Sequence, residues 1–157
     1  GRAIPAPPPL KGHAIEARLY AEDPDGGFLP MSGRVLKLVW PAGIRVEHAL
    51  REGVEIAPDY DPMLAKLIAH GADREDARKR LLAALRGTVL LGVQTNQSYL
   101  IRLLESKAFI ANDLALGRLP DVPAEELPLA AWAAAVPRNG PAVSRRSPWE
   151  TLGRWRV

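Results

Sequence analysis

The sequence predicts an α+β fold, in which an antiparallel β-sheet packs against helices. Two observations lead to this class. Segments with the alternating pattern of strands dominate residues 12–70, and helical periodicity begins only after residue 72. Strands that come first and helices that follow are typical of α+β domains. The chain has 157 residues, 47% of them hydrophobic and 25% charged, which suffices for one globular domain with a real core.

The first predicted strand covers residues 12–23. Successive side chains of a strand point to opposite faces, so one face collects residues that suit a core, namely Ile15, Ala17, Leu19 and Ala21. The second face collects Glu16, Arg18, Tyr20 and Glu22. Two interpretations of the second face stay open. It is either a solvated ladder of charges or an arginine steered by carboxylates toward an anion, a role that suits guanidinium because it stays protonated and offers a rigid fork of donors.

Further strands are expected before the helices. Residues 33–40 and 44–50 fit two of them, and the polar connection that follows has room for a short third one. Residues 63–70 are apolar on both faces except at Lys66, a pattern typical of a strand in the middle of a sheet. Lys66 itself fits an edge or snorkelling lysine.

Helical segments follow. Asp73 is expected to cap a helix whose apolar stripe includes Leu81 and Leu85, and Gly87 stands where a C-cap is expected. After a short strand at residues 88–93, Thr95 or Asn96 is expected to cap a second helix. A short helix or turn is expected at residues 108–111.

The composition excludes several kinds of site. The chain has no cysteine, so disulfides, thiolate chemistry and cysteine-bound zinc are excluded. Its three histidines lack ligand-like spacing, and no metal site is expected. Asp59 and Asp61 are interpreted as turn formers, with a metal or acid–base pair as the alternative. No apolar run approaches the roughly 18 residues of a membrane span, and no signal peptide is visible, so a cytoplasmic location without a membrane partner is expected.

Three segments make up the predicted organisation. Residues 1–10 are rich in proline, residues 11–119 form the domain, and residues 120–157 form a Pro/Ala-rich linker and the start of a next domain. The net charge of +3 is concentrated in the tail, where five arginines stand after residue 136. A basic linker is favoured over a nucleic-acid surface there, and no nucleic-acid partner is expected. We expect the chain to be a piece of a larger protein.

Five motifs together resemble a known family. In chain order they are "GHAIEARLYAEDP", "GFLPMSGRV", "GIRVE", "YDPMLAKLIAHGADREDA" and "LGVQTN". They closely resemble the C-terminal domain of biotin carboxylase, the carboxylating half of biotin-dependent acyl-CoA carboxylases. The tail "SPWETLGRWRV" resembles the segment that leads into the subunit-joining domain of methylcrotonyl-CoA and propionyl-CoA carboxylase α subunits.

The resemblance implies an ATP-dependent C–N ligase with a fold of the ATP-grasp type. Biotin, ATP, Mg²⁺ and bicarbonate take part in the full-length enzyme, and the chain alone is expected to be inactive and to hold none of them tightly. The implied partners are the N-terminal part of the same biotin carboxylase, the biotin carboxyl carrier domain and the carboxyltransferase β subunit, with a homodimer as a further possibility. The acyl-CoA substrate is chosen in the carboxyltransferase subunit, which is absent here.

The resemblance also implies roles for particular residues. Arg18 matches the catalytic arginine of the family, which stabilises the biotin enolate when the ureido nitrogen loses its proton. Glu16, like Glu22, is a candidate to hold that arginine and so to orient substrate. Arg45 matches a position at the dimer interface of the bacterial enzyme, and Leu116 matches a position near the adenine pocket. The alternatives are a structural or dimerisation module, in which Arg18 is only structural, and another enzyme of the group, such as acetyl-CoA, pyruvate or urea carboxylase.

Overall fold

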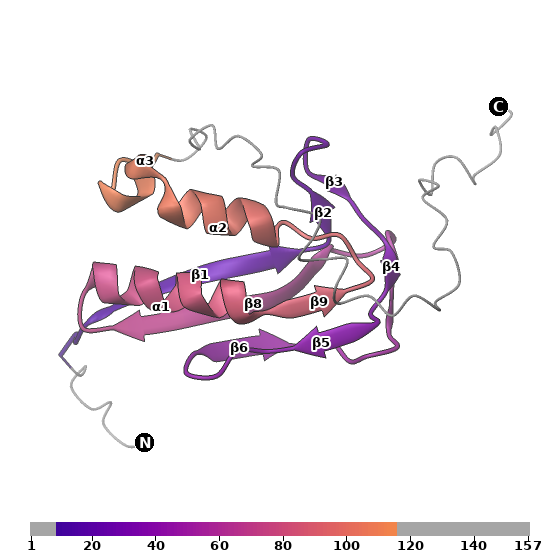
Figure 1. Cartoon of the computed structure of the whole chain (residues 1–157), viewed down its shortest axis with the longest axis horizontal. Helices are drawn as coiled ribbons and strands as arrows, with labels where there is room; N and C mark the ends of the chain where they lie inside the picture. Colours follow the sequence, from indigo (N-terminus) through magenta and orange to yellow (C-terminus); the bar gives the residue numbers. More distant parts are fainter. Residues whose placement is uncertain (1–8, 116–157) are drawn as a thin grey trace, which may run out of the picture. The chain divides into compact units, whose positions relative to one another are not determined.

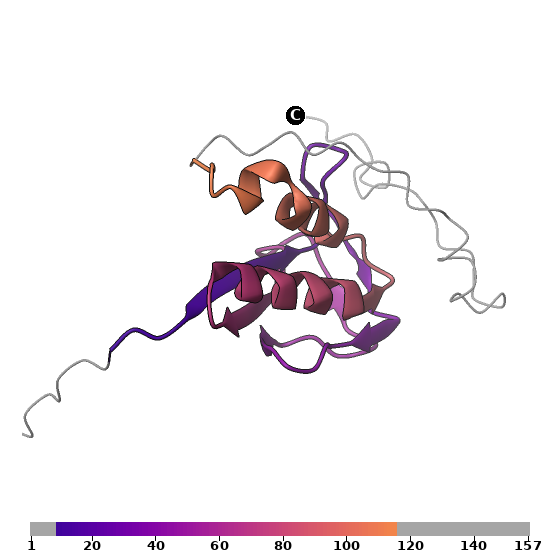
Figure 2. The same ribbon diagram turned by 60° about the vertical axis from the view of Figure 1, so that its left-hand side comes forward.

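The computed structural model describes residues 9–115, which form small antiparallel sheets covered by helices (Figure 1). Helix α1 lies along the two long strands β1 and β8, as the turned view in Figure 2 also shows. The elements in chain order are β1 (His13–Tyr20), β2 (Glu22–Asp23), β3 (Leu29–Pro30), β4 (Gly33–Arg34), β5 (Lys37–Val39), β6 (Arg45–His48), β7 (Glu55–Ile56), β8 (Met63–Gly71), α1 (Arg74–Gly87), β9 (Val89–Leu91), α2 (Gln97–Glu105) and α3 (Lys107–Ile110).

The main sheet has three strands in the order β1-β8-β6, and both pairings are antiparallel. The α+β class with an antiparallel sheet is therefore confirmed. Strand β8 lies in the middle, as its apolar sequence predicted. The face toward α1 carries the buried residues Ala17, Leu19, Ala65, Leu67 and Ala69, which form the core with Leu81 and Leu85 of α1.

Helix α1 begins and packs as expected. The Asp73 carboxylate accepts a hydrogen bond from the backbone N–H of Asp76 at 2.8 Å, which satisfies one free donor of the first turn. Gly71 allows the close approach of the helix to β8, because a Cβ atom there would lie 2.4 Å from the Ala77 nitrogen. Gly87 does not form a left-handed cap: it is the last helical residue, and Thr88 ends the helix in an extended conformation.

Two predicted strands are divided because their parts have different partners. In the segment predicted at residues 33–40, β4 pairs with β7 and β5 pairs with β9, so a single straight strand does not form. The segment at 12–23 breaks at Ala21, whose N–H bonds to the Pro62 carbonyl, and its end continues as β2 paired with β3. The short strand expected in the polar connection is β7.

Several expectations concern residues outside the described range. Leu116 and the whole of residues 120–157, with the basic tail, lie there, and so do most of the proline-rich residues 1–10. Among residues 9–115, no helix is both long enough and apolar enough to cross a membrane.

Candidate functional site

The face of the main sheet that points away from α1 carries a group of charged side chains. We call it the charged face and define it by Glu16, Arg18, Arg45, Glu47 and Lys66. Strand pairing arranges them in two rows across the sheet. One row runs from Glu16 through Ile68 to Arg45, and the next runs from Arg18 through Lys66 to Glu47. Residues directly opposite in an antiparallel pair share a face, so both rows project on the same side.

Arg18 is held from its own strand by Glu16. The Arg18 Nε donates to Glu16 Oε1 at 2.9 Å, and the two side chains stay 57% and 38% exposed. This contact, followed by the neighbouring Tyr20 hydroxyl, raises the pKa of the Arg18 guanidinium above its ordinary value. Of the two candidate carboxylates, Glu16 is thus the one in contact with Arg18. More than half of the Arg18 side chain remains exposed to solvent.

Asn96 binds the backbone of β1 from the Arg18 carbonyl to Tyr20. Its Nδ2 donates to the Arg18 carbonyl oxygen at 3.3 Å, and its Oδ1 accepts the Tyr20 N–H at 2.9 Å. The Asn96 N–H donates to the Tyr20 carbonyl at 3.2 Å. Asn96 is only 6% exposed, and it makes no side-chain cap on α2. It therefore acts as a strand partner for β1, at the point where the pairing with β8 shifts register after Leu19.

Sequence reasoning assigned Asn96 only a capping role. Its contacts with β1 join residues 76 and 78 positions apart, so no local pattern could reveal them. The one available signal was an asparagine at an expected helix start. The side chain of such an asparagine can cap the helix, but it can also bind backbone groups elsewhere.

The remaining charged side chains divide into a paired set and Lys66. Arg45 donates to Glu47 within β6. Lys66 is half-buried and lies between Arg18 and Glu47 in its row, and it belongs to none of the ion pairs within residues 9–115. Of the two interpretations of Lys66, the edge lysine is wrong because β8 is the central strand, and the snorkelling lysine remains a prediction.

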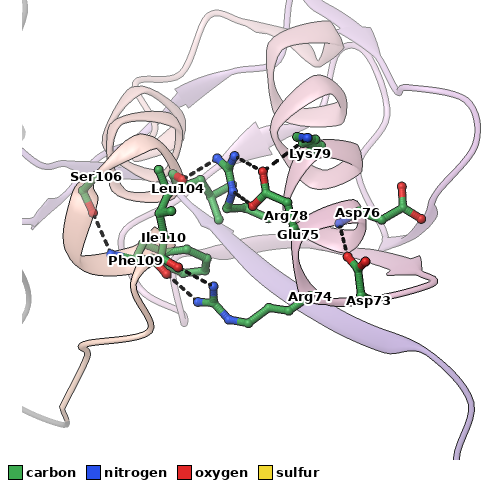
Figure 3. A network of polar contacts seen from close by, with 10 residues as sticks. All are labelled: Asp73, Arg74, Glu75, Asp76, Arg78, Lys79, Leu104, Ser106, Phe109 and Ile110. Carbon is green, nitrogen blue, oxygen red and sulfur yellow. Dashed lines mark hydrogen bonds and ion pairs between the residues drawn. The ribbon is translucent and has the colours of Figure 1, made fainter.

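A second polar cluster joins α1 to the helices that follow it (Figure 3). The buried Arg78 donates twice to Glu75, at 2.7 Å each, and donates to the Leu104 carbonyl at 2.9 Å. Arg74 donates to the Phe109 carbonyl at 2.6 Å and lies over the ring of the same residue, 4.7 Å from its centroid. These arginines bind backbone carbonyls near the ends of α2 and α3, so the cluster fixes how the helices pack on one another.

The acidic and histidine residues noted in the sequence are spread over the domain. Asp61 accepts the Met63 N–H at 2.8 Å, which is the turn-forming role expected for it. The charge of Asp61 also raises the pKa of Glu22, an effect second to the partial burial of Glu22 itself. His70 contacts the Lys11 carbonyl, whereas His48 stacks against Trp40 with ring centroids 4.6 Å apart. Among the described residues, no group of three such side chains could hold a metal ion.

Comparison with known families places this geometry in context. Residues 16–120 match the model of the biotin carboxylase C-terminal domain. The methylcrotonoyl-CoA carboxylase subunit alpha of Dictyostelium discoideum is 35% identical, over 94% of this chain and 24% of that protein. The propionyl-CoA carboxylase alpha chain of Caenorhabditis elegans is 42% identical, over 73% of this chain and 16% of that protein. The chain thus spans a quarter or less of the length of these relatives.

Solved structures agree with the sequence matches. The urea carboxylase of Kluyveromyces lactis superposes with a TM-score of 0.70 at 38% identity, over 73% of this chain and 10% of that chain. The dimeric biotin carboxylase domain of the 2-oxoglutarate carboxylase of Hydrogenobacter thermophilus, in complex with MgADP and bicarbonate, superposes with a TM-score of 0.62 at 42% identity, over 63% and 22% of the two chains. The family match covers most of the chain and includes Arg18, Lys66 and Asn96, and the chain belongs to the biotin carboxylase C-terminal domain family.

Proposed function

We propose that this chain is the C-terminal part of a biotin carboxylase, within an acyl-CoA carboxylase α subunit of the methylcrotonyl-CoA or propionyl-CoA type. The reaction would join biotin and bicarbonate at the expense of ATP, giving carboxybiotin, ADP and phosphate. The observation that carries the proposal is the state of Arg18: it is oriented by Glu16, its backbone is bound by Asn96, and its side chain remains open on one face of the sheet.

This arrangement suits the difficult step of the reaction. A ureido nitrogen is a very weak acid, and when it loses its proton, negative charge develops on the carbonyl oxygen. A cation that is already oriented where this charge appears lowers the barrier, because little reorganisation is needed during the step. Glu16 would orient the Arg18 guanidinium through its Nε and leave the other guanidinium N–H groups available for the biotin carbonyl oxygen. Biotin, MgATP and bicarbonate would be brought to Arg18 largely by the rest of the enzyme.

The type of carboxylase is supported by the extent of the matches. The match with the Dictyostelium methylcrotonoyl-CoA carboxylase subunit covers 94% of this chain. The matches with the urea amidolyase of Saccharomyces cerevisiae and the biotin carboxylase of Halalkalibacterium halodurans cover 64% and 67%. The longer match favours an acyl-CoA carboxylase over a urea carboxylase. The expected partners are then the carrier domain and a carboxyltransferase β subunit, and a cytoplasmic location stays a prediction.

Arg45 is proposed to lie at a homodimer interface of the full enzyme. It is exposed on β6 and is oriented by Glu47, much as Arg18 is oriented by Glu16. The Hydrogenobacter relative was solved as a dimer, which supports a dimer of this domain. The interface role of Arg45 and the adenine contact of Leu116 rest on the family resemblance.

The test of the catalytic proposal is biotin- and bicarbonate-dependent ADP release by the full α subunit, with Arg18→Gln compared with the wild type. Turnover is expected to fall about a hundredfold while the circular dichroism spectrum is unchanged. Arg80→Gln is a matched control, since Arg80 also donates its Nε to a carboxylate at 2.9 Å and is 54% exposed, but it lies on α1. If Arg18→Gln and Arg80→Gln both keep full turnover, Arg18 belongs to a structural charge ladder. That result would favour the alternative of a structural or dimerisation module.

A further inference from the structure

Asn96 makes three hydrogen bonds to one short stretch of β1. Its side chain binds the Arg18 carbonyl and the Tyr20 N–H, and its backbone N–H binds the Tyr20 carbonyl. The N–H and C=O groups of a strand are usually satisfied by a neighbouring strand, and an edge without one leaves them unpaired. A single asparagine thus takes the place of a neighbouring strand at the end of β1, on the edge opposite β8.

The contact between Glu16 and Arg18 does not fix the arginine relative to the rest of the domain. Both residues belong to β1, so a movement of the strand carries the pair with it. The pairing with β8 holds the other edge of β1, but its register shifts between Leu19 and Tyr20, directly after Arg18. The bonds of Asn96 reach the strand at this same place. They therefore give this end of β1 a second point of attachment to the domain.

Asn96 is itself fixed by the helices. It is buried, and its carbonyl accepts the N–H of Leu100, the first hydrogen bond of α2. The next residue, Gln97, donates its Nε2 to the Leu85 carbonyl at 2.7 Å and to the Thr88 carbonyl at 2.9 Å. The start of α2 is thereby joined to the end of α1, whose apolar side chains belong to the core.

Catalysis by a charged group depends on where that group is placed. A fixed donor stabilises developing charge only at the atom where the charge appears, and a displacement of about 1 Å can lower a rate about a hundredfold. We infer that Asn96 is a positioning residue for the proposed carboxylation of biotin: it fixes β1 against α2 at Arg18 and so sets the position of the guanidinium. The inference rests on the proposed role of Arg18 and assigns control of that role to a residue outside the charged face.

The first test measures biotin-dependent ADP release by the full α subunit carrying Asn96→Ala. Its kcat is expected to fall about tenfold, while the KM for MgATP stays unchanged because other parts of the enzyme would bind the nucleotide. Rates are compared per folded molecule, with the folded fraction taken from urea unfolding curves at the assay temperature. An Asn96→Ala enzyme with full turnover overturns the inference. Asn96→Ser, which keeps a helix-capping side chain but loses the amide, takes its place if Asn96→Ala does not fold.

Gln97→Ala is the matched control for this test. It also removes two side-chain bonds to backbone groups at the start of α2, but neither of them reaches β1. Its kcat per folded molecule is expected to equal that of the wild type. Equal losses of kcat in Gln97→Ala and Asn96→Ala would show a general effect of the α2 start and overturn the inference.

A double variant separates positioning from a general loss of structure. If Asn96 acts through Arg18, then adding Asn96→Ala to Arg18→Gln causes no further loss of turnover. Independent losses would instead multiply, and the double variant would be about tenfold slower than Arg18→Gln alone. That second result overturns the inference.

The position of the guanidinium is also measured directly. In the chain, the Nε–H of Arg18 is observed by ¹H–¹⁵N NMR, and its exchange with water reports how firmly its bond to Glu16 is kept. The exchange rate is expected to rise several-fold in Asn96→Ala and to stay unchanged in Gln97→Ala. The Nε–H of Arg80, which is paired with a carboxylate on α1, is the internal control. An unchanged exchange rate of Arg18 in Asn96→Ala overturns the inference.

The failure of this inference is distinguishable from the failure of the proposed function. If Arg18→Gln keeps full turnover, the catalytic role of Arg18 falls, and the role of Asn96 in the reaction falls with it. If Arg18→Gln loses turnover but Asn96→Ala keeps it, only the inference about Asn96 is overturned and the catalytic role of Arg18 stands.

Discussion

The side chain of Asn96 bonds to the backbone of the strand that carries Arg18, with its Nδ2 donating to the Arg18 carbonyl at 3.3 Å. Asn96 immediately precedes α2, so the start of this helix and the end of β1 are tied together. An arginine on an exposed strand face keeps its direction only if the backbone beneath it is fixed. The hydrogen bonds of Asn96 fix it on the edge of β1 that β8 does not cover.

Replacing Asn96 with alanine is expected to destabilise the domain by about 1–3 kcal/mol, because the Tyr20 N–H and the Arg18 carbonyl lose their buried partner. Urea unfolding of the chain measures the loss. Asn96→Asp is the informative comparison: it keeps an acceptor for the Tyr20 N–H but sets a buried carboxylate against the Arg18 carbonyl, so a loss at least as large as that of Asn96→Ala is expected at pH 7. Equal stability of Asn96→Ala and the wild type would show that solvent replaces both bonds without cost.

Arg78 is expected to be the most sensitive residue of the cluster between α1 and α2. Arg78→Met keeps the apolar stem but removes the bonds to Glu75 and to the Leu104 carbonyl, at a cost of about 2–3 kcal/mol. Chemical denaturation measures this cost. Arg80→Met on the same helix breaks one exposed pair with Asp76 and is expected to change the free energy of unfolding by less than about 0.5 kcal/mol. Similar effects of the two changes would contradict a special role for Arg78.

Local patterns predicted the parts of the fold that depend on neighbours in sequence. The alternation in residues 12–23 identified the buried face with Ala17 and Leu19, and the Asp73 cap identified the start of α1. The apolar run in β8 predicted a central strand because burial on both faces leaves a direct trace in composition.

The sequence contains no comparable signal for which strands pair with one another. The division of residues 33–40 into β4 and β5 depends on β7 and β9, which lie far along the chain. For the same reason the sequence showed Arg18 and Lys66 as separate cations: only the register of β1 against β8 brings them opposite each other. The sequence could name Glu16 and Glu22 as candidate partners of Arg18, but the break at Ala21 decides between them by turning the end of the strand toward β3.

Glu75 is expected to support the fold down to strongly acidic pH. Its bonds to Arg78 lower the pKa of its carboxyl from 4.5 to about 2. A carboxyl with a lowered pKa stabilises the folded state fully above its unfolded value, and this contribution is lost as the pH falls toward the folded value. The stability difference between wild type and Glu75→Gln is therefore expected to be constant above about pH 5.5 and to disappear between pH 4.5 and 2. Urea midpoints measured across this range give the profile, and a difference that does not change with pH would contradict the pairing.

Glu22 is expected to behave in the opposite way. Its partial burial, and after that the charge of Asp61, raise the pKa of its carboxyl, so the folded state prefers the protonated form. A raised pKa gives a contribution that is complete below the unfolded value and is lost as the pH rises through the folded value. Glu22→Gln, which mimics the protonated form, should thus be more stable than the wild type at pH 7 and should match it near pH 4. Glu55→Gln on β7 is the control for an exposed strand carboxylate. A stability loss in Glu22→Gln at pH 7 would show that the fold needs the ionised carboxylate of Glu22. Glu22 would then again be a candidate for supporting Arg18.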